Sequence, residues 1–379
     1  MRQLSLPTIN FDRCLQLFLF LSPILWLPGI EQNSLQFILF DFGAILLLPL
    51  AIMFGVQREC RNPAPATIVA CGIILSLMIN PKAYPIGMIH LVAGVLLYYA
   101  IVLGVKNPRK ILWTFAAVMV VNIVIAIAQK TGFYLVYDTG SITNTSIKES
   151  HLSMPGLMGR NYHLGYIMVF LTPLCFILKK WLGWIMMLIS LLFIVLIESW
   201  ACRLAFGTMS LVLLSRMIPK RYLLISILLI AGLVTSLYHP VLQRKIRVRT
   251  DSYNYIINES LINIFKGRGI GTFDIDTRLY DADSIVESSF NQYLRTIYEM
   301  GIIPFLIMCM AFWKYFKSFT SKNIYFLASI AAILTYPMFH EVLRFARFNI
   351  LIIAVVALFE ISCINRQSQL FKEIGHVKS

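Results

Sequence analysis

The chain has 379 residues, of which 58% are hydrophobic and only 13% are charged, and its mean hydropathy is +0.75. Soluble domains carry roughly 25% charged residues, so this composition excludes an ordinary soluble protein and indicates a membrane protein. The formal net charge of +15 would suggest nucleic-acid binding in a soluble protein. In a membrane protein about half of this excess reflects Lys and Arg in cytoplasmic loops, and we expect no nucleic-acid partner.

Continuous apolar runs of about 17 to 22 residues predict an all-α, polytopic protein that forms one membrane domain over residues 1–379. The first run has no small-residue cleavage site behind it, and we interpret it as a retained helix. The predicted spans, about twelve in number, are 14–30, 35–55, 65–80, 84–104, 111–130, 163–178, 181–198, 200–217, 221–238, 291–313, 324–340 and 346–364.

An even number of spans places both termini on one side of the membrane. With both termini in the cytoplasm, the short cytoplasmic loops hold a majority of the Lys and Arg, as the positive-inside rule requires. Two long segments then lie outside, namely 131–162 after the fifth span and 239–289 after the ninth. The first of them is rich in Ser, Thr and Asn, and by composition alone it reads as a solvated connector.

The segment 239–289 is too long and too charged for a simple connector. It holds seven of the 33 Lys and Arg and begins with the basic run Gln243–Arg249. The pattern over Thr250–Phe265 predicts an amphipathic helix, and Gly267–Phe273 predicts a turn with close backbone approach. Clustered Arg side chains suit a phosphate or pyrophosphate at the outer leaflet, although anionic headgroups would serve as well.

Motifs for other chemistries are missing from the sequence. No Cys and His spacing resembles a metal site, and neither a Walker-type phosphate loop nor a dinucleotide glycine fingerprint occurs. We therefore expect neither a metal nor a cofactor.

Four segments taken in order resemble the superfamily of O-antigen ligases and O-antigen polymerases, which are glycosyltransferases of the bacterial inner membrane. The resemblance covers about residues 155–305. The four segments are Met158–Gly165, Ser199–Ala205, Arg249 with Tyr253 and the turn Gly267–Phe273, and Phe290–Gly301. Members of this superfamily transfer glycans from undecaprenyl diphosphate at the periplasmic face, so the resemblance implies that activity and that location.

The chain departs from the ligase pattern at two positions. Phe290 stands where ligases carry the His of a His-Asn pair, and Cys202 replaces a Ser, although Arg203 is retained. Polymerases are looser at the first position. The departure at Phe290 therefore favours a polymerase over a ligase by a small margin.

Glycosyl transfer from a lipid diphosphate needs cations to stabilise the leaving group and an acceptor for the hydroxyl proton. The catalytic candidates are the cations Arg203 and Arg249 and, as proton acceptors, Glu287 and His340. The candidates for substrate binding are Arg160, Asn161, Arg247, Tyr253, Gly269, Gly271 and Asn291. Each also has a plainer interpretation, because Arg, His and aromatic residues near helix ends often lie at the membrane interface and loop acids are usually solvated.

Three functions remain open from the sequence. A polymerase would move the growing glycan onto the next lipid-linked repeat unit, and a ligase would move the finished glycan to a lipid A-core. Both would bind an undecaprenyl-diphosphate-linked donor and membrane lipids, and a polymerase could also bind a chain-length regulator. A lipid-linked oligosaccharide flippase or transporter is the third, but it needs charges at mid-membrane depth, and we expect almost no ionisable residues in the spans.

Overall fold

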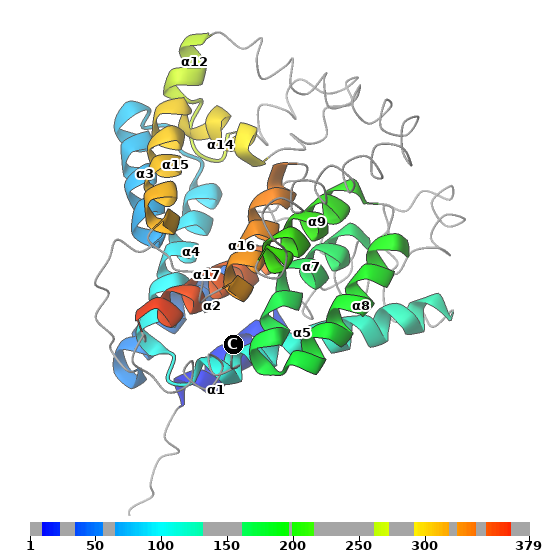
Figure 1. The fold of residues 1–379 in the computed structure, drawn as a ribbon. Coiled ribbons are helices and arrows are strands. Elements are labelled where there is room, and N and C mark those ends of the chain that lie inside the picture. Colours follow the sequence, from blue (N-terminus) through cyan, green and yellow to red (C-terminus); the bar gives the residue numbers. More distant parts are fainter. Residues whose placement is uncertain are drawn as a thin grey trace, which may run out of the picture.

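The computed structural model describes residues 10–22, 35–55, 65–131, 161–196, 199–215, 261–272, 292–317, 324–338 and 346–364. Within these ranges every regular element is a helix (Figure 1), which confirms the predicted all-α fold class. Two of these helices contain stretches long and apolar enough to cross a membrane, Gly87–Gly104 and Pro108–Lys130. The other apolar helices of the described part are shorter, so twelve spans stay a prediction.

The helices follow the predicted spans closely. Their bounds are α1 Phe11–Leu21, α2 Leu35–Phe54, α3 Pro65–Ile79, α4 Pro85–Gly104, α5 Pro108–Lys130, α7 Asn161–Leu178, α8 Lys180–Leu196, α9 Trp200–Leu214, α12 Leu261–Lys266, α14 Gln292–Met300, α15 Ile302–Lys317, α16 Ile324–Thr335 with the 3-10 turn η3 Tyr336–Met338, and α17 Ala346–Ile364. The ninth predicted span and most of the predicted amphipathic helix lie outside the described residues.

The tenth predicted span is two helices instead of one. Gly301 separates α14 from α15 and has a φ of +87°, a left-handed conformation that ends an α-helix and that glycine adopts at little cost. α14 carries polar side chains on one face, whereas α15 is apolar. The chain therefore turns at Gly301, and only α15 resembles a spanning segment.

Local sequence explains where several helices begin. The Asn107 side chain accepts a hydrogen bond from the backbone N–H of Lys110, and Pro108 occupies the first position of α5. Ser199 caps α9 in the same way through the N–H of Cys202. Such caps satisfy backbone N–H groups that have no partner inside the helix, so short polar residues mark these helix starts.

The described helices form two packed groups (Figure 1). α2, α3, α4, α15 and α17 pack together, as do α5, α7, α8, α9 and α16. α1 packs on both α5 and α2, and α16 packs on α17, so the groups share one apolar core. The buried Asp12 carboxylate strengthens this junction, because it accepts hydrogen bonds from the backbone N–H groups of Lys106 (2.8 Å) and Asn107 (2.9 Å).

The outward faces of many helices are apolar. Met78 of α3 is 78% exposed, Val195 of α8 64% and Met310 of α15 63%. A helix that is apolar on all sides is stable only when its outer face also avoids water. The outer surface of the described helices thus suits contact with lipid.

Candidate functional site

An aromatic stack lies where α7 and α9 begin and α16 ends. The rings of Tyr166 and Tyr336 are stacked with centroids 3.9 Å apart, and both side chains are almost fully buried. α9 packs against α16 and η3, so its first turn lies at the same end of the helix group. The stack therefore links the start of α7 to the end of α16, beside α9.

Arg203 lies in the first turn of α9 and holds the end of α8. Its Nε donates a hydrogen bond to the carbonyl oxygen of Ile194 at 3.4 Å, and an Nη donates to that of Val195 at 3.5 Å. The last carbonyls of an α-helix have no partner within the helix, so this arginine stabilises the end of α8. Its positive charge also lies at the N-terminus of α9, where the helix dipole favours an anion.

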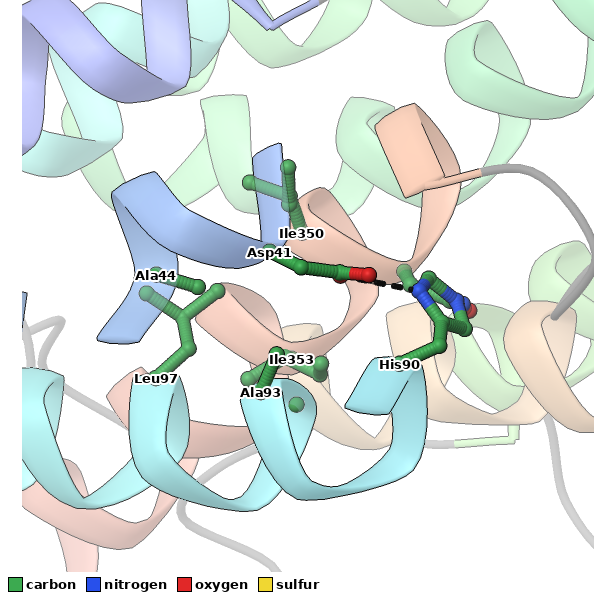
Figure 2. A pocket seen from close by; sticks show the side chains of 9 residues that line it. Asp41, Ala44, His90, Ala93, Leu97, Ile350 and Ile353 are labelled. Atoms are coloured by element: carbon green, nitrogen blue, oxygen red, sulfur yellow. Dashed lines mark hydrogen bonds and ion pairs between the residues drawn. The ribbon is translucent and has the colours of Figure 1, made fainter. Parts of the chain in front are cut away.

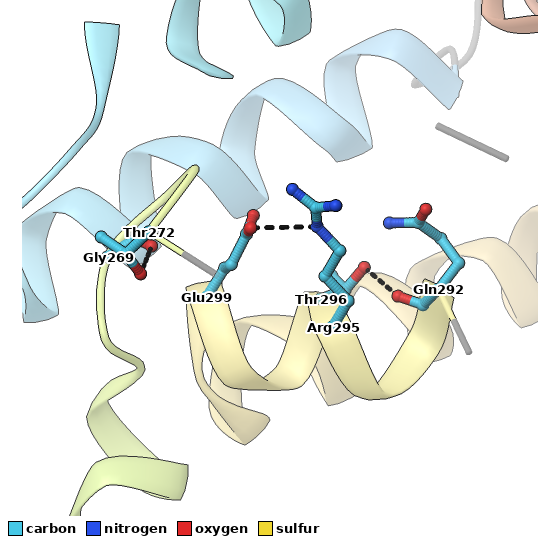
Figure 3. Close-up of polar contacts among 6 residues, drawn as sticks. All are labelled: Gly269, Thr272, Gln292, Arg295, Thr296 and Glu299. Carbon is cyan, nitrogen blue, oxygen red and sulfur yellow. Dashed lines mark hydrogen bonds and ion pairs between the residues drawn. The ribbon is translucent and has the colours of Figure 1, made fainter. Parts of the chain in front are cut away.

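α14 lies beside the end of α16 and carries its own buried polar groups. The Tyr293 hydroxyl donates to the carbonyl oxygen of Leu334 near the end of α16, at 2.6 Å. The Arg295 Nε and the Glu299 Oε1 are 3.0 Å apart, and their side chains are only 10% and 13% exposed. Figure 3 shows that Gln292, Arg295 and Glu299 project from the same face of α14.

The Glu299→Ala variant tests this ion pair. Loss of the carboxylate removes a charge-assisted hydrogen bond from the nearly buried Arg295, so we expect the free energy of unfolding to fall by about 2 kcal/mol. Thermal unfolding in detergent measures the change. Glu299→Gln retains an acceptor oxygen and should lose less. Equal stability of all three proteins would show that the pair is not stabilising.

The glycine turn after α12 packs tightly against the end of α14. The backbone N–H groups of Arg268 and Gly269 donate to the carbonyl oxygens of Tyr298 (2.8 Å) and Glu299 (3.0 Å). A Cβ atom at Gly267, which has a φ of +73°, would lie only 2.5 Å from the Glu299 carbonyl oxygen. Only glycine permits this approach.

The same turn also contacts the connection between α3 and α4. The Tyr84 N–H donates to the Ile270 carbonyl oxygen at 2.7 Å. A Cβ atom at Gly269 would lie 2.5 Å from the Lys82 carbonyl oxygen, and one at Gly271 3.1 Å from the Tyr84 Cβ. The glycines predicted to bind substrate thus have a packing role of their own, which brings the turn to the start of α4.

These contacts connect four segments that are far apart in the sequence. The glycine turn contacts α14, α14 contacts the end of α16, and that end contacts the starts of α7 and α9. The described parts of all four segments that resemble the O-antigen superfamily therefore lie at one end of the helix bundle.

A second polar cluster joins α2, α4 and α17 and was missed from the sequence. The His90 Nδ1 is 3.0 Å from the Asp41 Oδ1, and the Asn349 Nδ2 forms a short hydrogen bond with the His90 Nε2. These three side chains line a cleft with the apolar side chains around them (Figure 2). The expectation that the spans hold almost no ionisable residues needs correction, because Asp41 and Glu360 are both buried in apolar helices.

The structure describes some of the predicted site residues and not others. Arg203, Gly269 and Gly271 lie at the end of the helix bundle where the described parts of the four segments meet. Asn161 is the first residue of α7. The remaining candidates lie outside the described residues, namely Arg160, Arg247, Arg249, Tyr253, Glu287, Asn291 and His340. For these residues the assigned roles stay predictions.

One signal could have revealed the second cluster. Ionisable residues inside apolar spans are rare and usually functional, and Asp41 and His90 both lie within predicted spans.

In the described residues, no group of three or more His, Cys, Asp or Glu side chains could hold a metal ion. No protein-family model matches the chain, and no curated protein matches it.

Proposed function

We propose that this chain is an O-antigen-type polymerase of the bacterial inner membrane. It takes a glycan from undecaprenyl diphosphate and transfers it to a sugar hydroxyl of the next lipid-linked repeat unit at the periplasmic face. The observation that supports this proposal is the meeting of the four segments at one end of the bundle. Segments separated by more than a hundred residues lie together here, as an active site built from distant parts of a chain requires.

The charges at this end suit the donor. Arg203 adds a cation to the N-terminus of α9, and both features attract an anion such as a diphosphate. Diphosphate is already a good leaving group, so fixed positive charge supplies much of the transition-state stabilisation. Arg249 would add a second cation from the 239–289 segment, and the isoprenoid tail would lie against the apolar outer faces of the helices.

The acceptor defines the alternatives. Transfer to a lipid A-core would make the chain a ligase, and a chain-length regulator would be a further partner only for a polymerase. The buried Asp41 and Glu360 and the partly buried His90 give a transporter one supporting observation, since ionisable groups inside apolar helices often mark transport pathways.

Deletion of the gene in its own host distinguishes these functions when the surface glycans are separated on a gel. A polymerase predicts loss of the long ladder and survival of a core with one repeat unit. Loss of every repeat from the core, with polymer accumulating on undecaprenyl diphosphate, would identify a ligase. Accumulation of single lipid-linked repeats on the cytoplasmic side would identify a flippase, and an unchanged ladder would contradict all three.

A further inference from the structure

We propose that His90, oriented by Asp41, is the proton acceptor of the transfer reaction; this inference rests on the proposed function. The sequence alone names Glu287 and His340 for this role, because Phe290 replaces the superfamily's His. His90, on α4, is a third candidate, and the structure describes residues that contact its ring.

The contact with Asp41 gives His90 the arrangement of a general base. Asp41 is an acceptor, so the imidazole donates its Nδ1–H to the carboxylate over 3.0 Å. The Nε2 atom then carries the lone pair, and the carboxylate stabilises the imidazolium that forms when Nε2 takes a proton. This is the role that a buried carboxylate has beside histidine in hydrolases of unrelated folds.

The other side of the ring faces Asn349 and the cleft. The Asn349 Nδ2 donates to Nε2, which fixes the ring between α2 and α17. The His90 side chain is 14% exposed, and it lines the adjoining cleft together with Asp41 and Asn349. In the proposed reaction the acceptor hydroxyl replaces Asn349 as the partner of Nε2.

The cluster lies close to the glycine turn. His90 is three residues after Gly87 and therefore on the same side of α4. A Cβ atom at Gly87 would lie 3.0 Å from the Gly271 Cα, so the turn contacts α4 one helical turn before His90. His90 therefore lies about one helical turn from the contact between the glycine turn and α4.

The acceptor hydroxyl gives its proton to the His90 Nε2, and its oxygen forms a bond to the anomeric carbon of the donor. The bond between that carbon and the diphosphate oxygen breaks, and undecaprenyl diphosphate leaves with the electron pair. In this step the cations would stabilise the negative charge on the diphosphate and the imidazole would take the hydroxyl proton, so separate groups would serve the two charges that develop.

Among the described residues, His90 faces Asp41 from α2 and the neutral Asn349 from α17, and the described part of α3 holds only Cys71 as a titratable group. The sequence of α17 also includes Arg347 and Glu360. On α1, the Asp12 carboxylate accepts hydrogen bonds from the backbone just after the C-terminal end of α4. In the sequence, the cations nearest to His90 are Lys82, in the connection before α4, and Lys106, after its end.

The test uses the full-length protein in nanodiscs with a synthetic undecaprenyl-diphosphate-linked repeat unit. We expect His90→Gln to lower kcat by about 100-fold or more with little change in KM, as loss of a general base does. The pH profile of kcat should differ between the wild type and His90→Gln, a difference that a purely structural role would not produce. Asp41→Asn should lower kcat less, and imidazole should partly rescue His90→Ala.

Ser190→Ala is the matched control, since it removes another buried hydrogen bond, to Thr172 on α7, far from the cleft. It should keep wild-type activity. Thermal unfolding separates a misfolded variant from an inactive one, and the pH profile of Asp41→Asn provides a second readout if His90 variants do not fold. A folded His90→Gln with wild-type kcat would overturn the assignment. If the wild-type protein itself makes no polymer, the proposed function fails and the assignment fails with it.

Discussion

Replacement of Arg203 by Ala is expected to lower the proposed glycan transfer by about 100-fold or more, because it removes the cation that we propose stabilises the developing diphosphate charge. The side chain also holds the Ile194 and Val195 carbonyls at the end of α8, so some stability is lost as well. Transfer is measured on purified protein as product formed per unit time, with thermal unfolding of the same sample.

Arg203→Gln separates the two roles. A glutamine amide can still donate to the α8 carbonyls but carries no charge, so this variant should be folded and nearly inactive. Arg109→Ala is the control, because Arg109 is exposed in the first turn of α5, and it should remain fully active. Normal transfer by a folded Arg203→Gln would exclude Arg203 from the diphosphate site.

Gly267→Val is expected to have the largest effect on stability. The left-handed conformation at a φ of +73° costs a β-branched residue about 1 to 2 kcal/mol, and the clash with the Glu299 carbonyl adds a similar amount. We therefore expect the free energy of unfolding to fall by about 2 to 4 kcal/mol, measured by denaturant titration in detergent. Transfer should also fall, because the turn can no longer pack against α14 and α4.

The neighbouring Lys266 supplies the control for this variant. Lys266 is exposed in the last turn of α12, and surface substitutions usually change stability by no more than about 0.5 kcal/mol. Lys266→Ala should therefore match the wild type. If Gly267→Val matched it too, the close packing of the turn would not contribute to stability.

Much of the helical arrangement could be predicted because it is local. Apolar runs give the helices, and Ser199 and the Asn107–Pro108 pair mark the starts of α9 and α5. The break at Gly301 was missed because hydropathy averaged over a span conceals Arg295 and Glu299 among apolar neighbours. A break of this kind depends on the backbone conformation of one residue, Gly301. Hydropathy averaged over a span contains no information on that conformation.

The candidate site was harder to predict because its parts are distant in the sequence. The contact between Asp41, His90 and Asn349 depends on how α2, α4 and α17 pack, and no spacing in the sequence encodes it. The glycines of the turn were recognised as positions of close approach, but the sequence did not reveal that protein backbone approaches them.

The proposed activity of this chain is the transfer of glycans from undecaprenyl diphosphate onto lipid-linked repeat units. The most direct test incubates purified protein, in lipid vesicles and without other enzymes, with undecaprenyl-diphosphate-linked repeat units. We predict a ladder of products that grow by one repeat unit, with one undecaprenyl diphosphate released for each bond formed. Unchanged substrate in the presence of folded protein would contradict the claim.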